Sequence, residues 1–174
     1  MPSFTAGNFV KAADLNALRD GINLLTTGMP HAFARQALTT TSVQPNTWTT
    51  IVFDTTEVDV DDGWGSSGVY TCATPGWYFV TASVCWANPT NSTSGNRGTR
   101  IVVNNTAVTG VSLLPAATSI VTGGSLARMV KLAFGDQLQV QAFQDTGAAI
   151  TTIVNYAAGR SEVSFCDIAF FAAA

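Results

Sequence analysis

The chain has 174 residues, a mass of 18.2 kDa and a formal net charge of −3, and only 11% of its residues are charged. This length suits one domain with a small appendage, and the few charges leave a largely neutral surface, part of which we expect to be covered in an oligomer or a larger assembly. The eight lysines and arginines are scattered and form no basic stripe for a phosphate backbone, so we expect no nucleic-acid partner.

Two features of the sequence indicate where the protein is made and whether it enters a membrane. No apolar run reaches the roughly 18 residues that a membrane-spanning helix needs, and the N-terminus lacks the basic-then-apolar layout of a signal peptide. We therefore expect synthesis in the cytoplasm and no membrane insertion. The three cysteines, Cys72, Cys85 and Cys166, stand among apolar or strand-forming neighbours, so we expect reduced core residues, with one disulfide as the alternative.

The first predicted element is a helix that ends at Gly28. Its apolar residues recur at intervals of three and four, and the stripe consists of Leu15, Leu18, Ile22 and Leu25. A helix of this length is marginal in water, so the stripe must pack on something: two further copies around a three-fold axis, or its own β-domain. Phe4 and Phe9 are expected to act as apolar anchors ahead of the helix. We predict a helical foot at residues 1–30, for attachment and trimerisation, and a second unit at residues 31–174.

After the foot, short strand-like runs alternate with turn signals, which is the pattern of an all-β sandwich or barrel. The predicted strands cover residues 32–38, 47–53, 69–72, 76–86, 99–103, 107–113, 125–134, 137–144, 149–156 and 161–171. Turns are predicted at Pro75-Gly76, Asn104-Asn105, Gly123-Gly124 and Gly135-Asp136, and residues 88–98 are predicted to form an exposed loop. In the run 137–144, apolar residues alternate with glutamines, which predicts a strand with one buried and one amide-rich face.

Ordered segments of the β-region resemble the C1q/TNF-like family between residues 31 and 171. The segments are Phe33, Ile51-Val52-Phe53-Asp54, the stretch from Tyr70 to Pro75-Gly76-Trp77-Tyr78-Phe79, the run from Val130 through Gly135-Asp136 to Leu138, and the closing run from Ser164 to Phe171. Cys166 and Asp167 depart from the pattern where a glycine is usual. The resemblance implies an all-β C1q/TNF-like jelly-roll sandwich whose heads pack as a homotrimer around a three-fold axis.

The foot is similar to a different group of proteins. From Phe4 to Leu18 it resembles the N-termini of bacteriophage tail and other virion appendage proteins, with Lys11 where these often have a helix-capping threonine. Together, the two resemblances imply a trimeric virion surface protein, made in the cytoplasm of the host bacterium, whose foot docks on other virion proteins. A minor tail protein that adheres to the host, a capsid decoration protein and a head fibre all remain open.

The residues needed for catalysis are scarce. His31 is the sole histidine and follows the predicted end of the helix, so we expect a surface or interface residue rather than a general base. The sequence contains no Gly-x-Ser-x-Gly elbow, no phosphate-binding glycine-rich loop and no His or Cys cluster at zinc spacing. We therefore predict that the protein is not an enzyme and needs no cofactor.

One acidic series could hold a metal ion. Glu57, Asp59 and Asp61 alternate in sequence, so an extended chain would place them on one face about 6 to 7 Å apart. Calcium would relieve their repulsion, but Gly68 stands where an EF-hand loop has its closing glutamate. A solvated acidic loop is therefore favoured over a calcium site.

A carbohydrate-binding jelly roll is the further alternative for function. Its ligand would bind in exposed loops, and the candidate residues are Trp64, Asn91, Asn96 and Arg97. A glycan of the host cell surface would then be a partner. The fold alone does not decide between a binding and a structural role.

Overall fold

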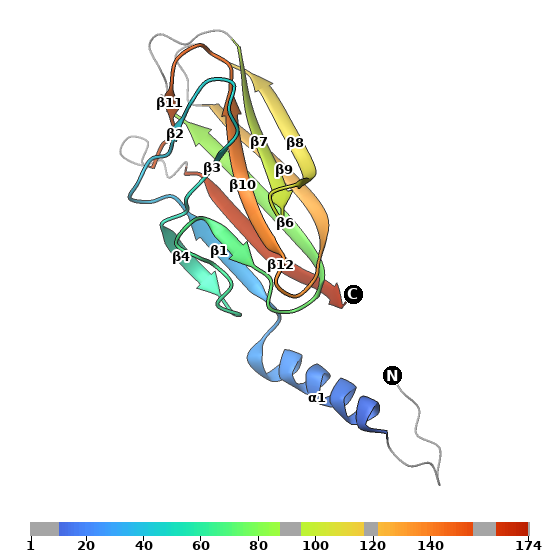
Figure 1. The fold of residues 1–174 in the computed structure, drawn as a ribbon. Coiled ribbons are helices and arrows are strands. Elements are labelled where there is room, and N and C mark those ends of the chain that lie inside the picture. The colour runs from blue at the N-terminus through green and yellow to red at the C-terminus, as the bar shows by residue number, and fades with distance from the viewer. Residues whose placement is uncertain (1–10, 88–94, 117–121, 155–162, 174) are drawn as a thin grey trace.

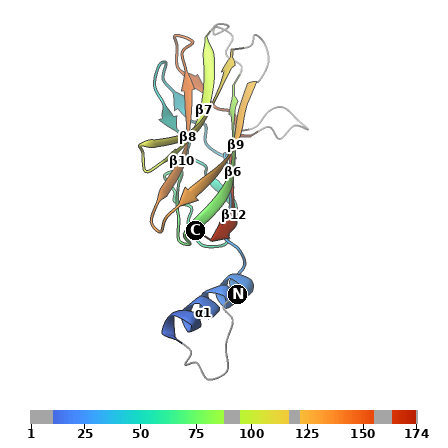
Figure 2. The same cartoon turned by 90° about the vertical axis from the view of Figure 1, so that its right-hand side faces the viewer.

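A computed structural model describes residues 11–87, 95–116, 122–154 and 163–173 of the chain (Figure 1). The described part consists of one helix and two facing β-sheets, and Figure 2 shows the sheets as separate layers with the helix below them. This confirms the prediction of a mostly β sandwich preceded by a short helix. The helix is too short and too polar to cross a membrane.

Helix α1 (Ala12–Thr27) stands away from the sandwich rather than folding back on it (Figure 1). Lys11 has no side-chain acceptor for the first turn, but the carboxylate of Asp14 reaches back and accepts a hydrogen bond from the Lys11 N–H at 3.3 Å. The helix ends at Gly28, as predicted, where φ is 89°, a value that a glycine adopts without strain.

The first sheet has five antiparallel strands in the order β4-β1-β12-β6-β9. Their bounds are Thr55–Asp59 for β4, His31–Arg35 for β1, Phe165–Ala173 for β12, Gly76–Trp86 for β6 and Thr122–Leu132 for β9. Neighbours in this sheet come from distant parts of the chain, so the sheet forms only when the whole domain folds. The helix leads directly into β1, one of its inner strands.

The second sheet has the order β3-β10-β7-β8, and β5 also pairs with β10. The bounds are Thr49–Thr50 for β3, Gln137–Gln144 for β10, Asn96–Val103 for β7, Ala107–Pro115 for β8 and Val69–Thr71 for β5. Two further strands, β2 (Ser42–Val43) and β11 (Ile150–Thr151), pair with each other near one end of the sandwich (Figure 1).

The core lies between the two sheets and follows the alternation of their strands. Tyr78, Val80 and Ala82 point inward from β6, and Leu138 and Val140 do so from β10. The three cysteines are also buried and unpaired with one another, which confirms the expectation of reduced core residues. Burial in this apolar interior raises the pKa of the Cys166 thiol, so it packs as a small hydrophobe.

Several predicted boundaries were wrong. Gly123-Gly124 does not form a turn, because both residues lie inside β9 opposite Cys85 and Val84. A Cβ at Gly124 would lie only 2.8 Å from the Thr99 hydroxyl oxygen, so glycine is needed here for the close approach of two sheets. Strands β2 and β4 were not predicted, and the predicted strands at 47–53 and 149–156 are far shorter within the described residues.

Two of the other turn predictions correspond to real turns, whereas the bend before β6 lies at Ala73 and Thr74 and Gly76 is already the first residue of that strand. Asn104 and Asn105 both have positive φ, 52° and 60°, and join β7 to β8 as a tight hairpin. Gly135 has a φ of 81° and joins β9 to β10. The Asp136 carboxylate accepts a hydrogen bond from the Ala133 N–H at 2.8 Å and closes this second turn.

Candidate functional site

The outer face of the five-stranded sheet carries large apolar side chains on the side away from the core. Phe79 on β6 is 46% exposed and Met129 on β9 is 43% exposed. On β1 and β12, the rings of Phe33 and Phe165 pack with their centroids 5.9 Å apart. Each of these residues alternates with a buried residue on its own strand, so all point outward. We call this surface the apolar face and define it by Phe33, Phe79, Met129 and Phe165, with Trp77 beside them.

Strand pairing joins part of the apolar face into a row. Phe79 lies opposite Met129 on one side and Ala169 on the other, and Ala169 lies opposite His31. Three apolar side chains therefore lie side by side on three strands, each about 4.8 Å from the next, and the row ends at His31 on the fourth. Exposed apolar surfaces of this kind mark interaction sites.

One polar pair interrupts the apolar face. Nε2 of His31 lies 2.8 Å from Oδ1 of Asp167, and both side chains are about two-fifths exposed, 42% and 39%. The partner of His31 is thus a carboxylate on the neighbouring strand, which suits a surface or interface residue, as predicted. A second ion pair, Arg35 with Glu57 at 2.6 Å, lies towards the β4 edge of the same sheet.

A second exposed apolar surface runs along β8, the edge strand of the other sheet. Val108, Val111 and Leu113 are 47%, 43% and 57% exposed. At this edge β8 lies against β9 of the first sheet. The Arg128 side chain of β9 covers Gly110 of β8, and a Cβ built on Gly110 would lie 2.6 Å from Nε of Arg128. We call Val108, Val111 and Leu113 the β8 edge. It lies on the other sheet and is separate from the apolar face.

Along β10, the outer face of the second sheet carries a polar network that is satisfied by its own hydrogen bonds. Gln139 is only 3% exposed, because Thr50 donates to its Oε1 at 2.5 Å and its amide nitrogen donates to Asn105. Arg100 donates two hydrogen bonds to Oε1 of Gln141, at 2.6 and 2.8 Å. The amide-rich face of β10 predicted from the sequence exists, but it is partly buried under these neighbours. Because this network uses the polar groups internally, the apolar face is the better candidate for assembly.

The foot presents its stripe to the outside. Leu15, Leu18 and Ile22 are 55%, 54% and 49% exposed. Phe4, Phe9 and the side chain of Leu25 lie outside the described residues. The part of the stripe that the structure describes is therefore not covered by the head of its own chain, and it needs another partner to be buried.

The acidic series does not form a metal site. Glu57 pairs with Arg35, Asp59 accepts the N–H groups of Gly63 and Trp64 at 3.0 and 2.8 Å, and Asp61 accepts the Tyr70 hydroxyl at 2.8 Å. Within the described residues, no three His, Cys, Asp or Glu side chains converge as metal ligands. In the described residues each carboxylate therefore has its own protein partner, and Asp59 and Asp61 hold the turn that follows β4.

The four candidate ligand residues are not brought together. Trp64 is half-buried between Phe53 and Tyr70, with ring centroids 5.5 and 6.2 Å away. Arg97 is 1% exposed and lies opposite Gln144 on β10, whereas Tyr70 lies opposite Leu138, about 20 Å along the same strand. Asn96 is on β7 and donates to Asp145 at 3.0 Å, and Asn91 lies outside the described residues. Trp64 lines a pocket.

Comparison with known proteins gives a family for the head. Residues 32–158 match the C1q domain family. No curated protein matches the chain in sequence.

Solved structures with a similar fold include three from animals. The globular domain of zebrafish complement 1qA protein has a TM-score of 0.59 and 12% identity, with 83% of this chain and 99% of that chain covered. Murine APRIL at pH 5.0 has a TM-score of 0.61 and 10% identity, covering 83% and 100%. Eiger TNF from S. frugiperda has a TM-score of 0.61 and 13% identity, covering 84% and 94%. At such identities the likeness concerns the fold alone.

Proposed function

Because the chain belongs to the C1q domain family, we propose that it is a non-enzymatic, homotrimeric structural protein of a bacteriophage virion, displayed as a surface appendage such as a minor tail protein. The observation that carries the proposal is the apolar face, which leaves Phe79 and Met129 exposed on two neighbouring strands of a sheet. Burying a large apolar side chain contributes about 1.5 to 3 kcal/mol, so association of several such residues from each chain would be strongly favourable.

The arrangement of the two apolar surfaces favours a closed ring over a two-fold dimer. The apolar face and the β8 edge are different surfaces of one chain, so the β8 edge of one copy can pack on the apolar face of the next. Such a head-to-tail contact generates a ring when the rotation between copies closes. The C1q/TNF-like resemblance of the sequence implies that the ring has three members.

The virion role is supported by the foot. Its sequence from Phe4 to Leu18 resembles the N-termini of phage appendage proteins. Its helix extends from the end of the head with Leu15, Leu18 and Ile22 exposed (Figure 1). Three such helices beneath a trimeric head would bury part of each stripe against one another, and a groove on the particle would cover the rest. The head would then face outward from the virion surface.

Immunogold labelling of purified phage particles tests the virion role. We expect the label on intact particles, at a discrete position on the tail. Label on the capsid would assign the protein to capsid decoration or to a head fibre. The particles must be prepared from cells in which the protein is expressed. If such particles carry no label, the proposed virion role is wrong.

A further inference from the structure

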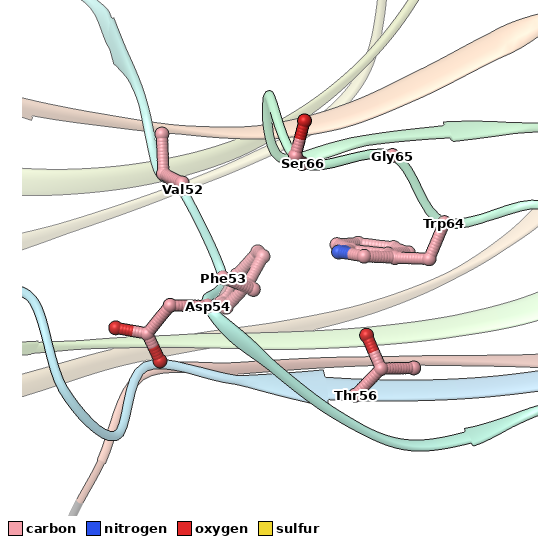
Figure 3. A pocket seen from close by; sticks show the side chains of 7 residues that line it. All are labelled: Val52, Phe53, Asp54, Thr56, Trp64, Gly65 and Ser66. Carbon is pink, nitrogen blue, oxygen red and sulfur yellow. The ribbon is translucent and has the colours of Figure 1, made fainter.

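A pocket of about 280 Å³ lies at the β4 edge of the sandwich, away from the apolar face. One wall is the segment that leads from β3 into β4, with Val52, Phe53 and Thr56, and the other wall is the turn that carries Trp64 and Ser66 (Figure 3). Drug-sized ligands occupy sites of roughly 300 to 1,000 Å³, so this pocket suits one small ring.

Both walls are held in place by carboxylates and by the backbone. Asp59 accepts the N–H groups of Gly63 and Trp64 and so fixes the backbone that carries the indole. The turn closes through the N–H of Gly68, which donates to the carbonyl of Gly65 at 3.1 Å. Gly68 has a φ of 78°, and a Cβ there would lie 2.3 Å from the carbonyl oxygen of Ile51. The two walls therefore approach as closely as backbone atoms allow, and the pocket is preformed.

Trp64 presents its nitrogen-bearing edge to the pocket. Figure 3 shows the indole with Nε1 at the end of the ring that faces Phe53 and Val52. This N–H is shielded from water and donates no hydrogen bond within the described residues. An unpaired buried donor costs about 1 to 3 kcal/mol. Because Nε1 is shielded in the free protein, a ligand oxygen reaches it only when a side chain of the pocket wall changes rotamer, and that contact would remove the cost.

The groups around the pocket favour an uncharged ligand over an ionic one. The Asp54 carboxylate would attract a cation, but both of its oxygens already accept hydrogen bonds, from the N–H groups of residues 37–39 and from the Thr55 hydroxyl. The indole edge that faces the pocket also carries partial positive charge, and only the face of an aromatic ring attracts cations. An anion is disfavoured by the Asp54 carboxylate in the wall. Burial works against ionisation of Asp54, but hydrogen bonds from three backbone N–H groups and from Thr55 outweigh it and lower its pKa, so the charge is present at neutral pH.

We propose that this pocket binds one unit of a neutral saccharide, with the Trp64 N–H donating to a sugar oxygen and the exposed hydroxyls of Thr56 and Ser66 meeting further hydroxyl groups. The apolar C–H surface of the sugar packs on Val52 and Phe53. The site goes beyond the proposed virion role and does not depend on it, because a single chain supplies every residue of the pocket.

Saturation-transfer difference NMR on the full-length protein tests the proposal, with methyl glucoside, methyl galactoside and N-acetylglucosamine as neutral probes. Sodium acetate and choline chloride serve as charged probes. We expect saturable binding of at least one neutral sugar and none of the charged compounds. Failure of all three sugars to bind, or tighter binding of acetate or choline than of any sugar, overturns the proposal.

Two variants locate the site. Trp64→Phe keeps an aromatic ring but removes the N–H, and we expect about tenfold weaker sugar binding, the value of one hydrogen bond of roughly 1.4 kcal/mol. Thr56→Val removes an exposed hydroxyl without touching the core and should weaken binding several-fold. Trp48→Phe, on the outer face of the other sheet, is the matched control and should bind like the wild type. Thr56→Val does not change the Trp64 side chain, so it tests the location of the site even if the Trp64→Phe protein is too unstable to measure. Unchanged binding in Thr56→Val and in any folded Trp64→Phe protein contradicts the assignment.

Discussion

The Asp54 carboxylate shows how one residue holds two parts of this fold together. It lies just before β4 and accepts the backbone N–H groups of Ala37, Leu38 and Thr39, at 2.7, 3.0 and 2.5 Å. It also accepts the hydroxyl of Thr55 at 3.1 Å. These bonds satisfy the backbone of the loop that follows β1, where no strand partner is present within the described residues. Charged acceptors give stronger hydrogen bonds than neutral ones, so this cap is a substantial local contribution.

Replacing Asp54 by Ala should lower the free energy of unfolding at pH 7. The change leaves three backbone N–H groups without their acceptor, and we expect a loss of about 1 to 3 kcal/mol, measured by urea unfolding. Asp62→Asn is a suitable control, because Asp62 is exposed, its substitution removes a similar charge, and asparagine tolerates the φ of 52° at this position. Equal stability of the Asp54→Ala protein and the wild type would show that water replaces the carboxylate without cost.

The same carboxylate predicts a dependence on pH. Because the pKa of Asp54 is lower in the folded protein than in the unfolded chain, where it is about 3.9, its ionised form stabilises the fold. That stabilisation is fully present above the unfolded pKa and is lost as the pH falls through the folded pKa. The stability gap between the wild type and Asp54→Ala should therefore narrow below about pH 4. If the difference in stability between the wild type and Asp54→Ala stays constant down to pH 2, the ionised Asp54 carboxylate is not its source.

The sequence showed which residues could bind a partner, but it did not show which partner each one binds in the fold. The alternation of Asp59 and Asp61 was visible, but the acceptors of a folded turn look the same in sequence as the ligands of a metal ion. Their roles became clear only from their partners, the Trp64 N–H and the Tyr70 hydroxyl. Gly124 illustrates the same point, because the need for glycine comes from Thr99, a residue on the other sheet.

At the scale of elements, the helix and the sandwich are separate in structure. The connection between them is short. Near the junction the Phe170 N–H donates to the Pro30 carbonyl at 2.9 Å, and this bond extends the pairing of β1 with β12 rather than holding the helix. Gly28 lies close to Val60, because a Cβ built on Gly28 would lie 3.6 Å from the Val60 side chain. Leu15, Leu18 and Ile22, the part of the stripe that the structure describes, do not belong to the core of the head.

Removal of residues 1–29 should leave a folded head. Pro30 and all strands of both sheets remain in the shortened chain, so no core residue is lost. We expect a cooperative thermal transition within a few degrees of that of the full chain, followed by circular dichroism. An insoluble head, or one without a cooperative transition, would mean that the helix stabilises the sandwich.

Changing Leu18 and Ile22 together to Asp should detach the protein from phage particles. Both side chains are about half exposed on the helix, so the charges should not unfold the head, but they would prevent burial of the stripe in a partner surface. The measurement is the amount of protein that copurifies with particles, compared with a Leu38→Asp control at an exposed site of the head. Normal copy number in the double variant would place attachment elsewhere.

The long strands were the elements that the sequence predicted best. The bounds of β6 and β10 were predicted correctly, because Pro75-Gly76 and Gly135-Asp136 mark their starts and apolar residues continue through them. The two-residue strands β2 and β11 carry too few residues to show any period. The apolar face could not be located in advance, because it joins residues as distant as His31, Phe79 and Ala169 through strand register. One signal was present: β6 is apolar on both of its faces, which is typical of a strand covered on both sides.

For the whole molecule, assembly follows from the surplus of exposed apolar surface over charge. With 11% charged residues, the chain has few groups to keep copies apart. The His31–Asp167 pair is the polar group within the apolar face, and its two members satisfy each other. The pair can therefore be buried at an interface with less loss than a lone charge would cause.

If the protein is the trimer that we propose, changing Phe79 to Lys should convert it to a folded monomer. Phe79 is 46% exposed and outside the core, so the fold tolerates the change, whereas an unpaired ammonium group in a buried interface is strongly unfavourable. Phe134→Lys is the matched control, since Phe134 is 76% exposed in the turn between β9 and β10 and away from the apolar face. A Phe79→Lys protein that still elutes as a trimer would exclude the centre of this face from the interface.

The most direct measurement for the account is the mass of the wild-type protein in solution, obtained by light scattering after size-exclusion chromatography at micromolar concentration. The apolar face and the β8 edge together predict a single species with three times the chain mass of 18.2 kDa, unchanged on dilution within that range. A species with the mass of one chain would contradict the account, because both surfaces would then be exposed to water in the native protein.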